Sequence, residues 1–129
     1  MSSVFASWDA EEYALVGSTE WVEEHTPWLS HTALTYLNID IGVSGPLPGA
    51  AATPGLRTLV QDVMKLVSYN NENRTLYDIW YELYQFHPED HGFSNLGSGS
   101  DYTSFLQLGI PVLDFGLDAS RESLSLIHI

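Results

Sequence analysis

Three short runs rich in apolar and β-forming residues predict buried strands. They are Val4–Trp8, Ala33–Asp40 and Ile110–Phe115, and each contains aromatic or β-branched side chains. The first run leads into the acidic stretch Asp9–Glu12, and the second ends on Asp40. Carboxyl ends of parallel strands meet at one edge of a sheet, where ligands bind. We therefore expect the carboxylates that follow these two strands to lie together.

Helices are expected between the strands. Gly17, Ser18 and Thr19 offer N-caps for a helix that Pro27 closes. Thr53 and Pro54 are typical of a helix start, and apolar residues then recur at spacings of three and four as far as Val67. The first two expected helices are therefore 17–27 and 54–67. A third begins at the capping box formed by Thr75 and Asp78. A fourth, 101–107, is capped by Asp101 and followed by Gly109.

The remaining segments complete a prediction of the fold. Gly42–Gly55 holds four Gly and three Pro and is predicted to be a long loop. Strands that alternate with helices favour an α/β fold, a three-layer sandwich with a mostly parallel sheet. We expect one structural unit over residues 1–119. Residues 120–129 fit neither a strand nor a capped helix, and we interpret them as an atypical tail, a truncated or misread end.

Composition excludes several classes of function. The 129 residues include 17 Asp and Glu but only 4 Lys and Arg, so the net charge is −13. We therefore expect no binding to nucleic acid, which clustered cations hold, and none to an anionic membrane surface. The absence of Cys excludes disulfides, zinc–thiolate sites and thiol nucleophiles. Apolar runs fall short of the roughly 20 residues of a membrane span, and we expect no membrane segment in this chain.

Paired carboxylates are the first candidates for chemistry. Glu11 and Glu12 follow a predicted strand, and consecutive side chains diverge, so one can bind a metal while the other acts as a general base. The alternative is a solvated surface, which we expect for Glu23–Glu24. Asp40 is a second candidate metal ligand, because a carboxylate fixed at a strand end suits a divalent cation. Its alternative role is a cap on the following turn.

Other motifs are weaker. His87 and His91 are four residues apart, but Pro88 and Gly92 favour a loop rather than a helical metal site. Gly97–Asp101 could bind an anion through backbone N–H groups or serve as a flexible entry to the next helix. Neither a dinucleotide fingerprint nor a nucleophile elbow is complete in this segment. A glycosylation sequon starts at Asn73 and, if used, would place that surface outside the cytosol.

Four blocks of sequence together resemble a known family. Phe5–Trp21, Tyr36–Asp40, Leu96–Tyr102 and Leu108–Ile110 resemble, in order and spacing, the zinc peptidases of the glutamate carboxypeptidase II and N-acetylated-α-linked acidic dipeptidase group, within the M28 metallopeptidases. The resemblance covers roughly residues 4–117. It implies an aminopeptidase- or carboxypeptidase-like catalytic domain, two zinc ions in the full-length parent and a peptide substrate.

The resemblance also implies roles for individual residues. Glu11 corresponds to the general base, Glu12 to a ligand of one zinc and Asp40 to a ligand of the other. Ser98, Gly99 and Ser100 correspond to the family's substrate-contacting loop. Parents of this kind are often homodimeric, and they are membrane-anchored with a lumenal or extracellular catalytic domain, secreted or vacuolar. The chain itself predicts no location.

This sequence departs from the family at several points. The family's upstream His and bridging Asp ligands have no counterpart here, and His128 does not match the downstream Tyr-His motif. Asp114 and Gly116 occupy positions where glutamate-preferring members carry arginines, which argues against selectivity for acidic substrates. We therefore expect a fragment of a co-catalytic zinc exopeptidase that is inactive alone. The alternative is a non-catalytic, peptidase-like ectodomain or interaction module that has lost its metals.

Overall fold

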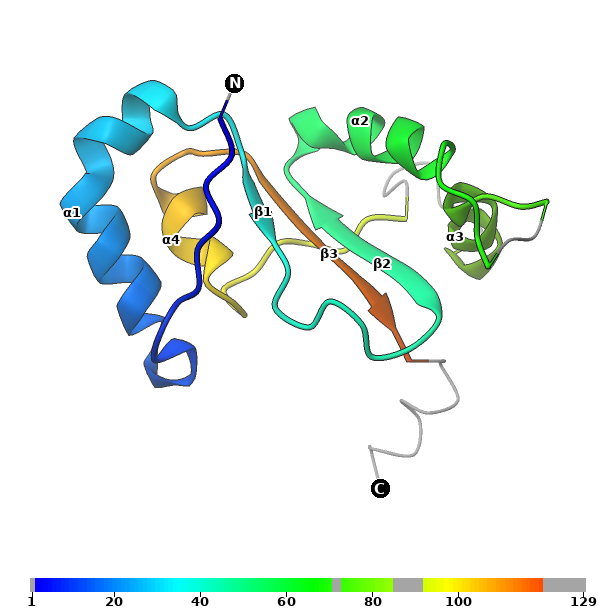
Figure 1. The fold of residues 1–129 in the computed structure, drawn as a ribbon, viewed down its shortest axis with the longest axis horizontal. Helices are drawn as coiled ribbons and strands as arrows, with labels where there is room; N and C mark the ends of the chain where they lie inside the picture. The colour runs from blue at the N-terminus through cyan, green and yellow to red at the C-terminus, as the bar shows by residue number, and fades with distance from the viewer. Residues whose placement is uncertain (1, 71–72, 85–91, 120–129) are drawn as a thin grey trace.

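The chain forms an α/β structure around a small mixed sheet (Figure 1). A computed structural model describes residues 2–70, 73–84 and 92–119. The three strands lie in the order β1-β3-β2. In chain order the elements are the 3-10 helix η1 (Glu11–Tyr13), α1 (Val16–Thr32), β1 (Tyr36–Asn38), β2 (Leu47–Ala52), α2 (Pro54–Met64), α3 (Leu76–Tyr84), α4 (Tyr102–Gln107) and β3 (Val112–Asp118).

The central strand, β3, has neighbours of both orientations. It pairs in parallel with β1, where Asn38 lies opposite Asp114, and antiparallel with β2, where Ala50 lies opposite Phe115. Across the described residues the sheet is therefore mixed, and the prediction of a mostly parallel sheet is wrong for them. The predicted third strand is confirmed in β3, although it continues three residues further than the apolar run indicated.

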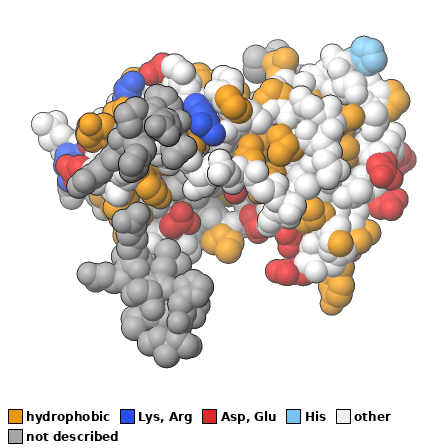
Figure 2. Space-filling model, turned by 180° about the vertical axis from the view of Figure 1, so that it is seen from behind, with side chains coloured by type: hydrophobic (Ala, Val, Ile, Leu, Met, Phe, Trp, Pro, Cys, Tyr) orange, Lys and Arg blue, Asp and Glu red, His pale blue; other side chains and the backbone are white. Residues whose placement is uncertain are grey.

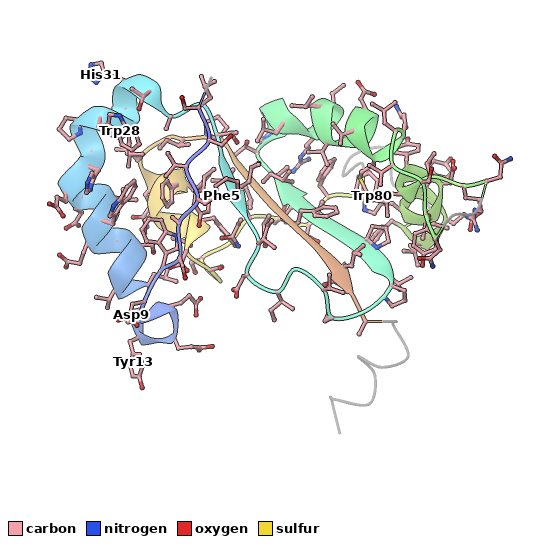
Figure 3. All side chains as sticks on the ribbon, viewed as in Figure 1. Phe5, Asp9, Tyr13, Trp28, His31 and Trp80 are labelled. Atoms are coloured by element: carbon pink, nitrogen blue, oxygen red, sulfur yellow. The ribbon has the colours of Figure 1, made fainter. Side chains whose placement is uncertain are left out.

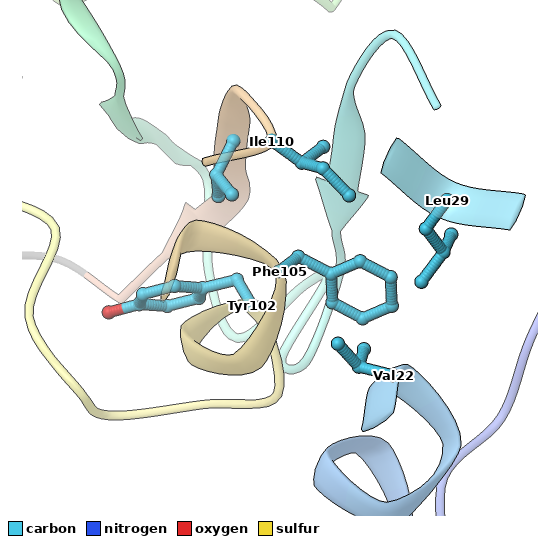
Figure 4. Close-up of a cluster of buried hydrophobic side chains, with 6 residues drawn as sticks. Val22, Leu29, Tyr102, Phe105 and Ile110 are labelled. Carbon is cyan, nitrogen blue, oxygen red and sulfur yellow. The ribbon is translucent and has the colours of Figure 1, made fainter. Parts of the chain in front are cut away.

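Helices cover both faces of the sheet. On one face α1 and α4 enclose a cluster that includes Val22, Phe105 and Val112 (Figure 4). On the other face α2 and α3 pack over a cluster that includes Met64 and Trp80, and Trp80 is fully buried. Val112 and Leu113, which are neighbours on β3, pack in the two different clusters because successive side chains of a strand point to opposite faces of the sheet. Figure 1 shows the two helix pairs on either side of the strands.

The predicted strand at Val4–Trp8 is not formed. No strand of the described chain pairs with this segment, and the Phe5 side chain is 97% exposed. Trp8 anchors it, since its indole N–H donates to the Tyr36 hydroxyl at 3.0 Å and its ring packs on Trp21 with 5.1 Å between centroids. The apolar run therefore docks as an irregular segment instead of extending the sheet.

The region predicted as a long loop contains strand β2. This strand lies at the edge of the sheet, where only one side needs hydrogen bonds. Pro48, which lacks an N–H group, is tolerated on such a strand. At Gly49 a Cβ atom would reach the end of the Asp118 side chain on β3, which would have to turn aside. The Pro and Gly residues that predicted a loop thus fit this edge position.

Helix α1 continues past the proline that was expected to end it. It extends from Val16 to Thr32 with Pro27 inside. The proline ring removes the hydrogen bond to the carbonyl of Glu23, which is on the exposed side of the helix and can bind water. Buried Val22 and Leu29, one on each side of the proline, hold both halves against the core. Packing therefore outweighs the local helix-breaking signal.

The observed starts of the other helices agree better with those predicted from sequence. Pro54 is the first residue of α2, as predicted, although only part of its apolar stripe is buried and Leu59 stays 59% exposed. The capping box before α3 is confirmed, because Thr75 N–H donates to Asp78 Oδ2 at 2.8 Å and Asp78 N–H donates to Thr75 Oγ1 at 3.2 Å. Asp101 precedes α4, but its side chain makes no capping bond.

Some predictions lie outside the described residues. They include the tail at 120–129 and the histidines His87 and His91. Among residues 2–70, 73–84 and 92–119, no helix has the length and apolar character needed to cross a bilayer.

Candidate functional site

A cavity of about 320 Å³ lies against the sheet where β1 ends. Three of the six predicted site residues, Asp40, Gly99 and Ser100, line it. Ser98 is exposed and is not part of its lining. Another cavity, of about 350 Å³, is lined by Thr53, Leu56, Ile110 and neighbours but by no titratable side chain. The first cavity is therefore the candidate site, and its wall also includes Tyr84, Ser94, Tyr102, Asp114 and Asp118.

A chain of hydrogen bonds connects two of the predicted residues. The Ser100 hydroxyl donates to Asp40 Oδ2 at 2.9 Å. The Asn38 amide Nδ2 donates to Ser100 Oγ at 3.2 Å and to Asp114 Oδ1 at 2.9 Å. Asn38 and Ser100 are each 4% exposed, whereas Asp40 is exposed. The buried part of this network thus ends on a carboxylate that faces the cavity.

Local structure explains how these residues meet. Asn38 at the end of β1 and Asp40 in the bend that follows both lie within hydrogen-bond distance of the Ser100 hydroxyl. Parallel pairing of β1 with β3 sets Asp114 directly beside Asn38. Ser100 is fixed by the turn before α4, where the Thr103 N–H and hydroxyl donate to its carbonyl at 3.0 and 2.8 Å. Three segments distant in sequence therefore converge.

The paired acids lie on η1, between the N-terminal segment and α1. Figure 3 labels Asp9 and Tyr13, which flank Glu11 and Glu12 in this turn. Desolvation raises the pKa of the Glu11 carboxyl above its ordinary value, and the charges of Glu12, Asp40 and Asp101 raise it further. Neither Glu11 nor Glu12 lines the cavity at the end of β1. Glu12 is exposed.

Left-handed backbone shapes the turn that carries the acids. Ala10 and Ala14 flank η1 with φ angles of 56° and 70°, a region that residues with a Cβ atom adopt at a cost. The Gly17 N–H donates to the Asp9 carbonyl at 3.1 Å, and a Cβ atom on Gly17 would clash with that same carbonyl. Close approach of these two backbones therefore fixes where η1 sits relative to α1.

Charge is distributed unevenly over the molecule. The cations of the described chain, Arg57, Lys65 and Arg74, are on α2, at its end and just before α3. Figure 2 shows these blue side chains at one end of the visible face, while red acidic side chains extend along its lower rim. The candidate cavity is lined by Asp40, Asp114 and Asp118 and by no Lys or Arg. Its electrostatic potential therefore favours cations over anions.

The described residues supply only part of a zinc centre. Within the described ranges, no three His, Asp or Glu side chains are grouped so that they could hold a metal ion. Asp40 by itself suits one ligand position, because its carboxylate is exposed at the cavity, Ser100 holds one oxygen, and the other has no hydrogen bond to the described residues. A complete centre would need ligands beyond those described.

Sequence reasoning missed two polar residues of the site, Asn38 and Asp118. Asn38 was noted only as part of a motif, yet it is the buried link between Asp114 and Ser100. Its position two residues before Asp40 is a signal that strand periodicity could have supplied. Asp118 also lines the cavity, but it lies beyond the predicted end of its strand and could not have been placed there from sequence.

Comparisons with known proteins agree on one family. The family model described as Peptidase family M28 matches residues 2–128. A probable glutamate carboxypeptidase of Arthroderma benhamiae is 51% identical over 128 residues, which cover 97% of this chain and 17% of that protein. The aminopeptidase NAALADL1 of Rattus norvegicus is 35% identical over 131 residues, which cover 96% of this chain and 18% of that protein.

A further relative is described as inactive. A Schizosaccharomyces pombe protein named as an inactive zinc metalloprotease is 32% identical over 121 residues, which cover 93% of this chain and 14% of that protein. This chain therefore spans about a sixth of the length of the curated relatives it matches. Family membership follows from these matches, whereas the activity of a whole protein does not.

Proposed function

Since the chain belongs to peptidase family M28, we propose that it is part of the catalytic domain of a zinc exopeptidase of the glutamate carboxypeptidase type. The substrate of the longer protein is a small peptide, and the reaction is hydrolysis of a peptide bond. Alone, the 129-residue chain is inactive. The remaining metal ligands come from parts of the longer protein that this chain does not include.

One observation supports the proposal: Asp40 and Ser100, which the family resemblance assigns to one site, come from separate segments and line the same cavity. Asp40 accepts a hydrogen bond from Ser100 at 2.9 Å. Desolvation, and to a smaller extent the charges of neighbouring carboxylates that include Asp40, raise the pKa of Glu11. Carboxylates with raised pKa values are enriched at functional sites, and the Glu11 carboxyl has a raised pKa. This supports a shared site, and the roles within it remain part of the proposal.

The residues divide the chemistry as follows in this proposal. Glu11 is the general base: a carboxylate with a raised pKa accepts a proton from the attacking water more readily and can return it to the leaving amine. Glu12 and Asp40 each bind one of two metal ions. Gly99 and Ser100 line the cavity that receives the peptide, and Ser98 contacts substrate from the exposed side of the same loop.

Replacement of the base tests the proposal. In the full-length protein we expect Glu11→Gln to lower kcat by roughly 10²–10⁴-fold, the usual contribution of a general base, and to leave bound zinc near its normal content. Hydrolysis of small peptides and zinc content are measured on the same preparations. Glu23→Gln, on the exposed face of α1, is the matched control and should leave both values unchanged. Retained activity in Glu11→Gln would remove this residue from its role.

A second function also has a specific observation behind it. The relative named as an inactive zinc metalloprotease covers 93% of this chain, so the fold is compatible with loss of catalysis. In that case the longer protein is a peptidase-like ectodomain or interaction module. A wild-type full-length protein that binds no zinc and hydrolyses no peptide would favour this second function.

A further inference from the structure

Ser100 is placed to orient a carboxylate as well as to line a cavity. We propose that Ser100 is a positioning residue that fixes the Asp40 carboxylate, and that Asn38 sets the direction of the Ser100 proton. The inference rests on the proposed function, because it treats Asp40 as a metal ligand. It differs from the role that the family resemblance implies for Ser100, which is contact with substrate.

Hydrogen-bond donors and acceptors determine the direction of the network. The Asp114 carboxylate can only accept, so the Asn38 amide must turn its nitrogen toward Asp114, 2.9 Å away. The second N–H of that nitrogen then donates to Ser100 Oγ at 3.2 Å. A serine hydroxyl has a single proton. With its oxygen already accepting from Asn38, Ser100 directs that proton to Asp40 Oδ2 at 2.9 Å.

Burial fixes the Asn38 and Ser100 side chains of this network but not the Asp40 side chain. Asn38 and Ser100 are each 4% exposed, and Thr103 holds the Ser100 carbonyl through two hydrogen bonds. Buried polar groups that are fully paired keep a single conformation, since breaking any one bond leaves an unsatisfied group. Asp40 is exposed and makes no other hydrogen bond to the described residues. The buried network therefore orients an exposed side chain.

This geometry has a consequence for metal binding. With Oδ2 held by Ser100, Asp40 keeps its Oδ1 oxygen available to a cation at the cavity. Groups that orient a ligating side chain typically change metal affinity or activity by 10- to 100-fold. A residue that only contacts substrate acts on KM instead. The two roles of Ser100 therefore predict different measurements.

The experiment compares three variants of the full-length protein. Ser100→Ala removes the hydroxyl, and Ser100→Thr keeps it. Ser104→Ala is the matched control, because Ser104 is also buried, at 6% exposed, and its hydroxyl makes one 2.9 Å bond to Thr19, away from Asp40. Zinc affinity is measured by competition with a chromogenic chelator, and kcat and KM are measured with a small peptide. Thermal midpoints report whether each variant folds.

We expect Ser100→Ala to weaken zinc binding by roughly 10- to 100-fold and to lower kcat at limiting zinc, with KM within twofold of wild type. Ser100→Thr should retain most of the zinc affinity, and Ser104→Ala should match wild type in zinc affinity even if it melts earlier. If Ser100→Ala raises KM with zinc affinity unchanged, Ser100 is a substrate contact and the inference is wrong. It is equally wrong if neither value changes.

Failure of the proposed function gives a different result. In that case the wild-type protein neither binds zinc nor hydrolyses the peptide, and the role of Ser100 fails together with it. A wild-type protein that does both, combined with a silent Ser100→Ala variant, would reject only the positioning role.

Discussion

At the scale of single residues, the site depends on donors that keep neighbouring acids apart. Asp40 and Asp114 line the same cavity, and Asn38 and Ser100 supply hydrogen-bond donors between them. Carboxylates that lack such donors would repel one another and shift toward the protonated form. Asn38 is therefore as important to the proposed site as the acids themselves, although it bears no charge.

A substitution at Asn38 tests this role. Asn38→Asp has almost the same shape but would set a second carboxylate beside Asp114 in a position that is 4% exposed. Two carboxylates this close cannot both ionise, so we expect a large loss of stability at pH 7.5 that partly recovers at pH 5.5, where the pair shares a proton. Differential scanning calorimetry of the full-length protein at both pH values measures the effect.

Asn38→Ala is the control for that experiment. It removes the donors without adding charge and should cost about 1–3 kcal/mol, the penalty for a buried acceptor left unsatisfied. Its loss of stability should depend less on pH than that of Asn38→Asp. The same pH trend in both variants would contradict a charge-separating role for Asn38.

At the scale of elements, one glycine determines where the acidic turn η1 lies. The backbones of Asp9 and Gly17 touch, and a Cβ atom at Gly17 would collide with main-chain atoms that cannot move aside as a side chain can. Gly17→Ala should therefore shift η1, which bears Glu11 and Glu12, away from α1. This displacement would disturb the proposed site and the packing of the N-terminal segment.

We expect Gly17→Ala to lower kcat of the full-length protein at least tenfold. The comparison variant is Gly55→Ala on α2, where no atom lies within 4 Å of a new Cβ. Alanine is favoured over glycine within a helix by about 0.5–1 kcal/mol, so Gly55→Ala should keep full activity and raise the thermal midpoint slightly. Equal activity in the two variants would show that the Asp9–Gly17 contact does not position the site.

The capping box gives a pH-dependent prediction for α3. Hydrogen bonds from the Thr75 N–H and hydroxyl lower the pKa of Asp78 below its ordinary value. A lowered pKa in the folded state stabilises the helix above the pKa of the unfolded chain, and this contribution disappears as pH falls through the folded value. Amide hydrogen exchange of Leu76–Tyr84 should therefore be slower at pH 6 than at pH 3, after correction for intrinsic rates.

Thr75→Ala provides the control for α3. It removes the hydroxyl that donates to Asp78 and accepts from its N–H, and loss of such a cap costs about 0.5–2 kcal/mol. Exchange of α3 amides should accelerate, and the pH effect should shrink. Unchanged exchange in this variant would mean that packing of Trp80, not the cap, limits the opening of α3.

Elements whose boundaries depend on neighbouring residues were predicted better than elements that depend on tertiary contacts. The starts of α2 at Pro54 and of α3 directly after the capping residue Thr75 depend on neighbouring residues, and both were predicted. Strand β2 was missed because Pro48 is acceptable only at a sheet edge, and sequence does not reveal which strand is the edge. Pro27 was misinterpreted because burial on both sides of it outweighs its helix-breaking effect.

Single residues of the candidate site could be identified from sequence, but the hydrogen bonds between them could not. Asp40 was identified from its place after a strand, and Ser100 from a family resemblance. Their hydrogen bond joins residues 60 positions apart, and nothing in the spacing predicts such a contact. The same holds for Asn38, whose partner Asp114 is 76 positions away and depends on the register of β1 against β3. Tertiary pairing, not local pattern, completes the site.

At the scale of the whole molecule, composition and fold agree on the kind of ligand the site attracts. The net charge of the chain is −13, the described cations cluster around α2 and the start of α3, and the cavity wall carries three Asp residues. Such a surface favours cations and disfavours acidic substrates. The proposed metal ions would offset this charge where the peptide binds.

The proposed function requires a metal ion beside Asp40 in the full-length protein. The most direct measurement is an anomalous-difference map at the zinc absorption edge, from crystals of that protein grown with zinc. We predict a peak about 2.0–2.2 Å from a carboxylate oxygen of Asp40, the distance typical of zinc–carboxylate bonds, with Glu11 facing the same centre without ligating it. An Asp40 carboxylate with no metal peak next to it, in a protein loaded with zinc elsewhere, would contradict the proposed role of Asp40 as a metal ligand.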